Sequence, residues 1–195
     1  AGRREARADD QSDRRITLLR HRPLERDEVP LLWTIDRAEY IENIYRLQDG
    51  QLVLEPHHFA VSGWPPGESD LYLPILLDTH DRQGYFEAAF DGDRLAGVAV
   101  VDPRPRGAHG ELVQLEFFHV SRPYRKAGLG SRLFESAKVA AVAFGARGLY
   151  ISATPSENTV NFYRAKGCVL SPQPDPELFA LEPEDIHLEL HFDER

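Results

Sequence analysis

The sequence predicts a single mixed α/β domain whose sheet is antiparallel in its front half. Residues 85–101 alternate as a β-hairpin does, with a turn at Asp91-Gly92-Asp93. Later strands at 111–120 and 149–153 are separated by an apolar helical stripe over 129–144. No internal repeat or linker appears after residue 16, so strands and helices belong to one mixed domain.

The first part of the chain predicts a tail, a strand and two helices. Residues 1–15 mix arginine with acidic residues, so we expect a disordered tail before a domain at 16–195. ITLLRH at 16–21 predicts a first strand. Apolar residues at three- and four-residue steps from Leu31 to Tyr45 predict a helix that Asp49-Gly50 ends. A loop at 63–69 follows, and Asp70 is placed to cap a short helix through Leu77.

The last part of the chain predicts a loop at 103–110, a short helix at 156–166 and a closing strand. In that strand, apolar residues from Ile186 to Phe192 alternate with His187, Glu189 and His191. Three such side chains on one face are conceivable metal ligands, but a solvated sheet face is the simpler interpretation. We therefore expect no metal site.

Composition narrows the class of protein. The formal net charge of −9 argues against a nucleic-acid partner and fits a cationic acceptor better. No apolar run approaches the about 18–20 residues of a membrane span. The single cysteine, Cys168, excludes an internal disulfide framework and fits a reducing cytoplasm. We expect a cytoplasmic protein without a membrane partner, and a buried Cys168.

A glycine turn joins the strand at 111–120 to the helix at 129–144. It reads Arg125-Lys126-Ala127-Gly128-Leu129-Gly130. A helix N-terminus offers unpaired N–H groups and partial positive charge, and glycines let a ligand approach the backbone. A diphosphate is the ligand that such a turn suits best. On spacing alone, a plain strand-to-helix turn explains the residues equally well.

Neighbouring motifs resemble those of one family. Arg125-x-x-Gly128-x-Gly130 resembles the [Gln/Arg]-x-x-Gly-x-[Gly/Ala] signature of the GNAT superfamily, the acyl-CoA-dependent N-acyltransferases. FFHVSRPYR resembles that family's fourth strand, LYISATPSENTVNFYRAKG its fifth strand and tyrosine helix, and FDGDRLAGVAVV its second and third strands. The resemblance is strongest over 111–168 and extends to 85–101. Residues 16–80, which shape the acceptor pocket in this family, match only in element type.

The resemblance implies an α/β (α+β) fold with a mixed sheet of about six to seven strands, splayed at the fourth and fifth strands and flanked by helices. It implies an N-acetyltransferase that moves the acetyl group of acetyl-CoA to a primary amine by direct attack on the thioester, without a metal. The acceptor is a small-molecule or peptide amine, and a homodimer is compatible with the family. The alternative is a non-catalytic acyl-CoA-binding or regulatory module on the same fold.

The resemblance also implies a cofactor site. The pantetheine arm is expected in the splay, paired with the backbone of Phe118, His119 and Val120. The diphosphate is expected on the N–H groups of the turn, beside the charge of Arg125. The N–H groups expected to bind the diphosphate belong to Lys126, Ala127, Gly128, Leu129, Gly130 and Ser131.

The tyrosine helix suggests the catalytic residue. Tyr163 matches the family's tyrosine and is expected to protonate or bind the leaving sulfur, although a core aromatic is the alternative. Many members carry asparagine seven residues earlier, where this chain has Ser156; Asn158 lies five before Tyr163. Ser156 can cap the helix or replace that asparagine, and Asn158 can also reach the cofactor.

The general base is less clearly marked. Glu116 is expected to share a face with Phe118 and Val120 if the strand is regular, and a solvated carboxylate is the alternative. A bulge would change that face. His119 is a second candidate, expected on the opposite face. Tyr45, Glu39 and Glu42, on the helix predicted from Leu31 to Tyr45, are candidates to line the acceptor site.

Overall fold

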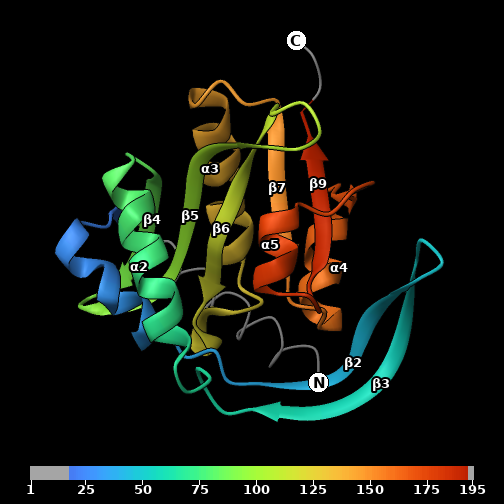
Figure 1. Cartoon of the computed structure of the whole chain (residues 1–195). Coiled ribbons are helices and arrows are strands. Elements are labelled where there is room, and N and C mark those ends of the chain that lie inside the picture. Colours follow the sequence, from blue (N-terminus) through green and yellow to red (C-terminus); the bar gives the residue numbers. More distant parts are fainter. Residues whose placement is uncertain (1–17, 193–195) are drawn as a thin grey trace, which may run out of the picture.

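The computed structural model describes residues 18–192, so the tail expected at 1–15 lies outside the described residues. A seven-stranded sheet forms the centre, in the order β1-β4-β5-β6-β7-β9-β8 (Figure 1). The strands are β1 (Arg20–Pro23), β4 (Tyr85–Asp91), β5 (Arg94–Arg106), β6 (Leu112–Val120), β7 (Gly148–Ala153), β8 (Val169–Leu170) and β9 (Ile186–His191). The antiparallel front half, β1-β4-β5-β6, is confirmed.

Helices cover both faces of the sheet. In Figure 1, α2 (Glu68–Asp81) and α5 (Pro176–Leu181) lie in front, while α3 (Leu129–Ala143) and α4 (Glu157–Ala165) lie behind. Two 3-10 helices, η1 (Arg26–Thr34) and η2 (Arg122–Tyr124), precede residue 39 and α3, respectively. We call the two faces the α2–α5 face and the α3–α4 face.

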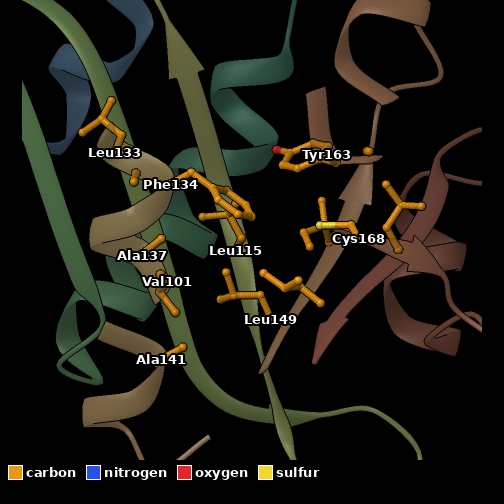
Figure 2. Packing of buried hydrophobic residues seen from close by; sticks show 14 of the residues in the cluster. Val101, Leu115, Leu133, Phe134, Ala137, Ala141, Leu149, Tyr163 and Cys168 are labelled. Carbon is orange, nitrogen blue, oxygen red and sulfur yellow. The ribbon is translucent and has the colours of Figure 1, made fainter. Parts of the chain in front are cut away.

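The stripe predicted for the helix at 129–144 builds the core of the α3–α4 face. Leu133, Phe134 and Ala137 are fully buried. Figure 2 shows them packed with Val101, Leu115 and Leu149 from β5, β6 and β7. Burying a leucine or phenylalanine side chain stabilises a fold by about 1.5–3 kcal/mol, so this stripe fixes α3 on the sheet.

The helix predicted from Leu31 to Tyr45 is wrong. Its first residues lie in η1, residues 35–38 form a connection, and the rest lie in β2 (Glu39–Gln48), which pairs with β3 (Gln51–Val61) in a two-stranded arm outside the main sheet (Figure 1). Asp49 and Gly50, taken as a helix end, are the turn of this hairpin. Their φ angles of 49° and 76° are both positive, as a tight two-residue hairpin turn requires.

Three further elements begin or end at residues other than those that the sequence predicted. Helix α2 starts after Gly67 and continues past Pro74 to Asp81, so it is longer than the helix expected from Asp70 to Leu77. Strand β5 continues through residues 103–106, which were expected in a loop. The first strand, expected at 16–21, spans Arg20–Pro23, and residues 16 and 17 lie outside the described residues.

The polar side chains of the closing strand are not solvated as expected. His187 and Glu189 are only 5% and 6% exposed, because they face the segment that contains α5. Only His191 is exposed. Helix α5, which the sequence pattern did not predict, is what covers this end of the α2–α5 face.

The sheet splays between β6 and β7, as expected. The two strands pair only from Leu112–Gly148 to Gln114–Tyr150. On its other side, β6 stays paired with β5 as far as Val120. The β7-facing edge of residues 115–120 is therefore left without a ladder partner in the described chain.

Within residues 18–192, no helix combines the length and the apolar character that crossing a membrane requires.

Candidate functional site

The site lies where β6 and β7 diverge. Phe118 and Val120 pack on the α3–α4 face, where the Phe118 ring stacks on Phe162 at 5.6 Å. His119 faces the other way, against Trp64 and Phe117, with ring centroids 4.9 and 4.6 Å apart. The predicted backbone stretch of residues 118–120 thus forms one wall of the splay, with its β7-facing edge open.

The glycine turn leads directly into α3. Lys126 and Gly128 have φ angles of 61° and 91°, and Gly128 is the N-cap of the helix, without a side-chain cap. The first helical bond runs from Arg132 N–H to the Gly128 carbonyl. The N–H groups of residues 129–131 therefore have no helical acceptor.

The space in front of this turn is open. A Cβ added at Gly128 meets no protein atom within 4 Å, and one added at Gly130 makes only ordinary contacts of 3.6 Å or more. Neither glycine is needed for packing against the rest of the chain. Free N–H groups, the helix dipole and open space together fit an anionic group such as a diphosphate.

The two cations of the turn differ in position. Arg125 donates hydrogen bonds to the carbonyls of Val120, Ala38 and Asp36, at 2.9, 3.2 and 3.3 Å. Its guanidinium therefore ties the end of β6 to the start of the arm, and burial lowers its pKa. Lys126 is exposed and leaves its ammonium group near the turn.

Tyr163 lies at the edge of the α3–α4 core, 5% exposed, next to Phe118 and Phe134. In Figure 2 its hydroxyl points away from Cys168 and toward the ribbon of β6. Within residues 18–192 this hydroxyl has no hydrogen-bond partner. Burial raises its pKa, with smaller contributions from Cys168 and Asp185. The phenol is therefore a neutral donor that is free to bind a ligand.

Ser156 and Asn158 have other partners in this structure. Ser156 is 4% exposed and caps α4, because its Oγ accepts from the Thr159 N–H and donates to the Thr159 hydroxyl. Asn158 donates to Glu39 Oε1 at 2.8 Å. Ser156 thus fits the capping role, and Asn158 fixes the start of the arm.

Glu116 does not share a face with Phe118. The register shifts between Val100–Phe117 and Val101–Leu115, so Glu116 lies in a β-bulge. The bulge turns its side chain toward Thr79 of α2, and the buried Oε2 atom of Glu116 has no hydrogen-bond partner within residues 18–192. Burial, with the negative charge of Asp102, raises the pKa of Glu116 to about 7.

His119 faces away from Phe118, as expected. Burial and the positive charges of Arg37 and Arg125 lower its pKa to about 3. The imidazole is therefore neutral near pH 7 and a weak base, which disfavours it as the main proton acceptor.

The acceptor candidates of residues 39–45 lie on a strand rather than a helix. Tyr45 is buried, donates its N–H to the Pro155 carbonyl at 2.7 Å and its hydroxyl to Asn161. Glu39 is held by Asn158, and Glu42 is exposed. Of the three, Tyr45 lines a cavity.

That cavity has a volume of about 300 Å³ and lies between β2 and the chain from β8 to β9. It also contains Asp185, whose Oδ2 accepts from Ser152 at 2.8 Å. Sequence reasoning missed Asp185, because only the tertiary structure brings residue 185 beside the end of β7. A wider groove of about 720 Å³ lies along the middle and end of α3, away from the glycine turn.

Among residues 18–192, no three histidine, cysteine, aspartate or glutamate side chains gather in a way that would hold a metal ion. Cys168 is buried as expected, and burial raises the pKa of its thiol to about 12. An unreactive, packed thiol is the result.

Comparison with known proteins agrees with this geometry. The model of the acetyltransferase (GNAT) family matches residues 40–168. Nourseothricin acetyltransferase is 19% identical in sequence, with a TM-score of 0.67 over 90% of this chain and 99% of its own. Comparison with curated protein sequences gives no significant match.

Two further structures are similar. One is assigned as a streptothricin acetyltransferase from Bacillus anthracis and was solved with acetyl coenzyme A. It has 19% identity and a TM-score of 0.65 over 90% of this chain and 99% of its own. The other, N-acetylglutamate synthase from Neisseria gonorrhoeae, has 14% identity and a TM-score of 0.58. It covers 91% of this chain and 36% of its own. At these identities the likeness establishes the fold.

Proposed function

Because the chain belongs to the GNAT family of acetyltransferases, we propose that it transfers the acetyl group of acetyl-CoA to the nitrogen of a primary amine. The observation that carries this proposal is the splay of β6 and β7 directly above an uncapped helix N-terminus. One part offers free backbone edges for the pantetheine arm, and the other offers free N–H groups for the diphosphate.

The residues of this chain fit that co-substrate. Residues 118–120 line the splay, the N–H groups of residues 129–131 lie at the open space around Gly128, and the exposed Lys126 adds positive charge to the same turn. Acetyl-CoA supplies an activated thioester. An unpaired backbone N–H on β6 is placed to stabilise the negative charge that develops on the carbonyl oxygen.

Tyr163 is the proposed proton donor. Its buried phenol is neutral, has no partner in the described chain and points toward β6. A phenol in this position can hydrogen-bond the sulfur and deliver a proton as the thiolate leaves. Glu116, the base expected from the sequence, faces α2 instead, and its role remains a prediction.

The acceptor is proposed to be a small-molecule amine. Similar structures are named for nourseothricin, for streptothricin and for N-acetylglutamate, so proteins of this fold differ in the molecule they modify. The net charge of −9 favours a cationic acceptor over an acidic one.

Calorimetric titration with acetyl-CoA tests the proposal. Binding should be tight, should weaken moderately with dephospho-CoA and should be lost with an acetylated pantetheine that lacks the diphosphate. Equal affinity for all three would remove the diphosphate from the α3 N-terminus. A thiol-release screen with amines then separates an enzyme from an acyl-CoA-binding module, which would bind the cofactor without turnover.

A homodimer remains a prediction, as does a cytoplasmic location. The arm favours the dimer because Tyr40, Leu47, Leu54 and Phe59 are large, apolar and 41–57% exposed. Exposed apolar side chains on a two-stranded arm are typical of an interface. Sedimentation equilibrium of the full chain would show a mass near 44 kDa for a dimer, twice the 22.1 kDa of the chain.

A further inference from the structure

We propose that the acceptor amine binds in the cavity between β2 and the β8–β9 segment, where Asp185 holds the ammonium group and takes its proton, and His187 donates a hydrogen bond to an uncharged oxygen of the same molecule. This assignment rests on the proposed acetyl transfer and deepens it to a substrate class.

The cavity is built from parts that are distant in sequence. Tyr45 and Leu47 come from β2, Phe179 from α5, and Asp185 and His187 from the chain that enters β9. Its volume of about 300 Å³ is near the lower end of small-molecule sites and suits an amine of modest size. Its lining combines the rings of Tyr45 and Phe179 with the carboxylates of Glu184 and Asp185, a combination that suits an amphipathic cation.

Asp185 connects the cavity to the splay. Its Oδ2 accepts a hydrogen bond from Ser152, near the carboxyl end of β7. The next residue, Ile186, pairs with Ala153 and packs in the same apolar cluster as Tyr163. The charge of Asp185 contributes to the raised pKa of Tyr163, so the carboxylate and the phenol are electrostatically coupled across the end of β7.

His187 provides the second contact. The Tyr150 hydroxyl accepts from the Asp175 N–H and forms a hydrogen bond of 2.7 Å with His187 Nδ1, in which we take the hydroxyl as the donor. The ring hydrogen therefore lies on Nε2, on the side away from Tyr150. The side chain is 5% exposed, and Nε2 has no partner within residues 18–192. A buried donor without an acceptor costs stability, and a ligand oxygen would remove that cost.

The charges around the cavity select against a free carboxylate. Arg46, the arginine that lines the cavity, is already paired with Glu184 at 2.7 Å and with Glu55 at 3.4 Å. Within residues 18–192 Asp185 has no cationic partner, and Glu182, bonded to Tyr72, adds a further negative charge nearby. The preferred ligand is therefore a primary amine with an amide or hydroxyl oxygen a few atoms away.

The protons and bonds of the acetyl transfer balance with these groups. Asp185 takes one proton from the ammonium and later releases it to solvent. The neutral nitrogen then forms the C–N bond as the C–S bond breaks. The second proton leaves the nitrogen and its equivalent reaches the sulfur through the Tyr163 hydroxyl, so the products are an amide and a thiol.

The reaction should gain rate as Asp185 ionises. Burial raises the pKa of Asp185 to about 6, against the hydrogen bond from Ser152 and with the negative charge of Glu182. The charged and titratable groups around it are Tyr72 on α2, Glu182 and Glu184 before β9, Arg46 on β2, Tyr163 on α4 and His187 on β9.

Two variants and three amines test the proposal in the full chain. Asp185→Asn keeps the size of the side chain, and Asp81→Asn, at an exposed carboxylate paired with Arg26, is the matched control. The amines are pentylamine, 5-aminopentanamide and 5-aminopentanoate. Wild type should favour the amide over the carboxylate, with a kcat/KM that rises through about pH 6.

Asp185→Asn should lower kcat/KM by about 100-fold or more, flatten that rise and leave acetyl-CoA affinity unchanged. His187→Phe should raise KM for 5-aminopentanamide and not for pentylamine. An Asp185→Asn variant with the rate and pH profile of Asp81→Asn overturns the assignment, as does a wild-type preference for the carboxylate. Wild type that releases no thiol with any amine instead refutes the acetyl transfer itself, and the assignment with it.

Discussion

Replacing Gly128 with glutamate tests whether the amino end of α3 holds a diphosphate. A Cβ at this position meets no protein atom within 4 Å, so the new side chain extends into the space in front of the helix. A carboxylate about 5 Å from one diphosphate charge is repelled by about 3 kcal/mol at an effective dielectric constant of about 20. Since about 1.4 kcal/mol is tenfold in affinity, the Kd for acetyl-CoA should rise by about 100-fold or more.

Gly145→Glu is the matched control at the opposite end of α3. Gly145 has φ of 79° against 91° for Gly128, and its surroundings are equally open. A side chain at such a φ costs about 1–2 kcal/mol, so both variants should lose about 2–8 °C in Tm. Thermal unfolding and calorimetric titration of the two proteins give the comparison. If Gly128→Glu binds acetyl-CoA as tightly as Gly145→Glu, the diphosphate lies elsewhere.

Three further variants test the site and the core. Tyr163→Phe should lower kcat by about 100-fold with little change in acetyl-CoA affinity, as measured by thiol release and calorimetry; unchanged kcat would make Tyr163 a packing residue. Glu116 has its pKa raised to about 7 in the folded chain, so it binds more protons folded than unfolded, and its contribution to stability is lost as pH rises from about 4.5 to 7. Denaturant titrations give the free energy of unfolding at pH 5 and at pH 8. Its drop between these pH values should be smaller for Glu116→Gln than for wild type, by up to about 3 kcal/mol. Equal drops in the two proteins would contradict the burial argument. Phe134→Ala should cost about 3–5 kcal/mol because the ring is fully buried, whereas Val139→Ala should cost under about 0.5 kcal/mol because Val139 is 71% exposed.

Local patterns predicted the second half of the fold. The stripe of α3 and the capping serine of α4 are read from neighbouring residues, and both are confirmed. The arm was missed because Ile41, Ile44 and Tyr45 also satisfy a helical period. What decides their structure is pairing with β3 and the contacts of Ile44 and Tyr45 with residues 155 and 156, which no local window contains.

Some parts of the candidate site could likewise be predicted from local motifs, and others depend on tertiary structure. The glycine turn and Tyr163 are local motifs, so their positions could be predicted. The face of Glu116 depends on a one-residue bulge opposite β5, and alternation along a strand gives no sign of it. Asp185 has no motif at all, and its place beside Ser152 arises from the antiparallel pairing of β7 with β9.

The two-stranded arm has a consequence for how proteins of this shape diversify. It adds no strand to the seven-stranded sheet and takes no part in the ladder between β5 and β6. Near the splay it is attached by a backbone hydrogen bond from Tyr45 to Pro155 and a bridge between Ile44 and Ser156. Side-chain hydrogen bonds to α4 from Glu39, Asn43 and Tyr45 add to them. Insertions or exchanges at exposed arm positions, away from the buried Ile44 and Tyr45, can therefore reshape one wall of the proposed acceptor cavity while the core packing stays intact. The amine specificity of such proteins can therefore change during evolution while the residues of the proposed thioester site stay the same.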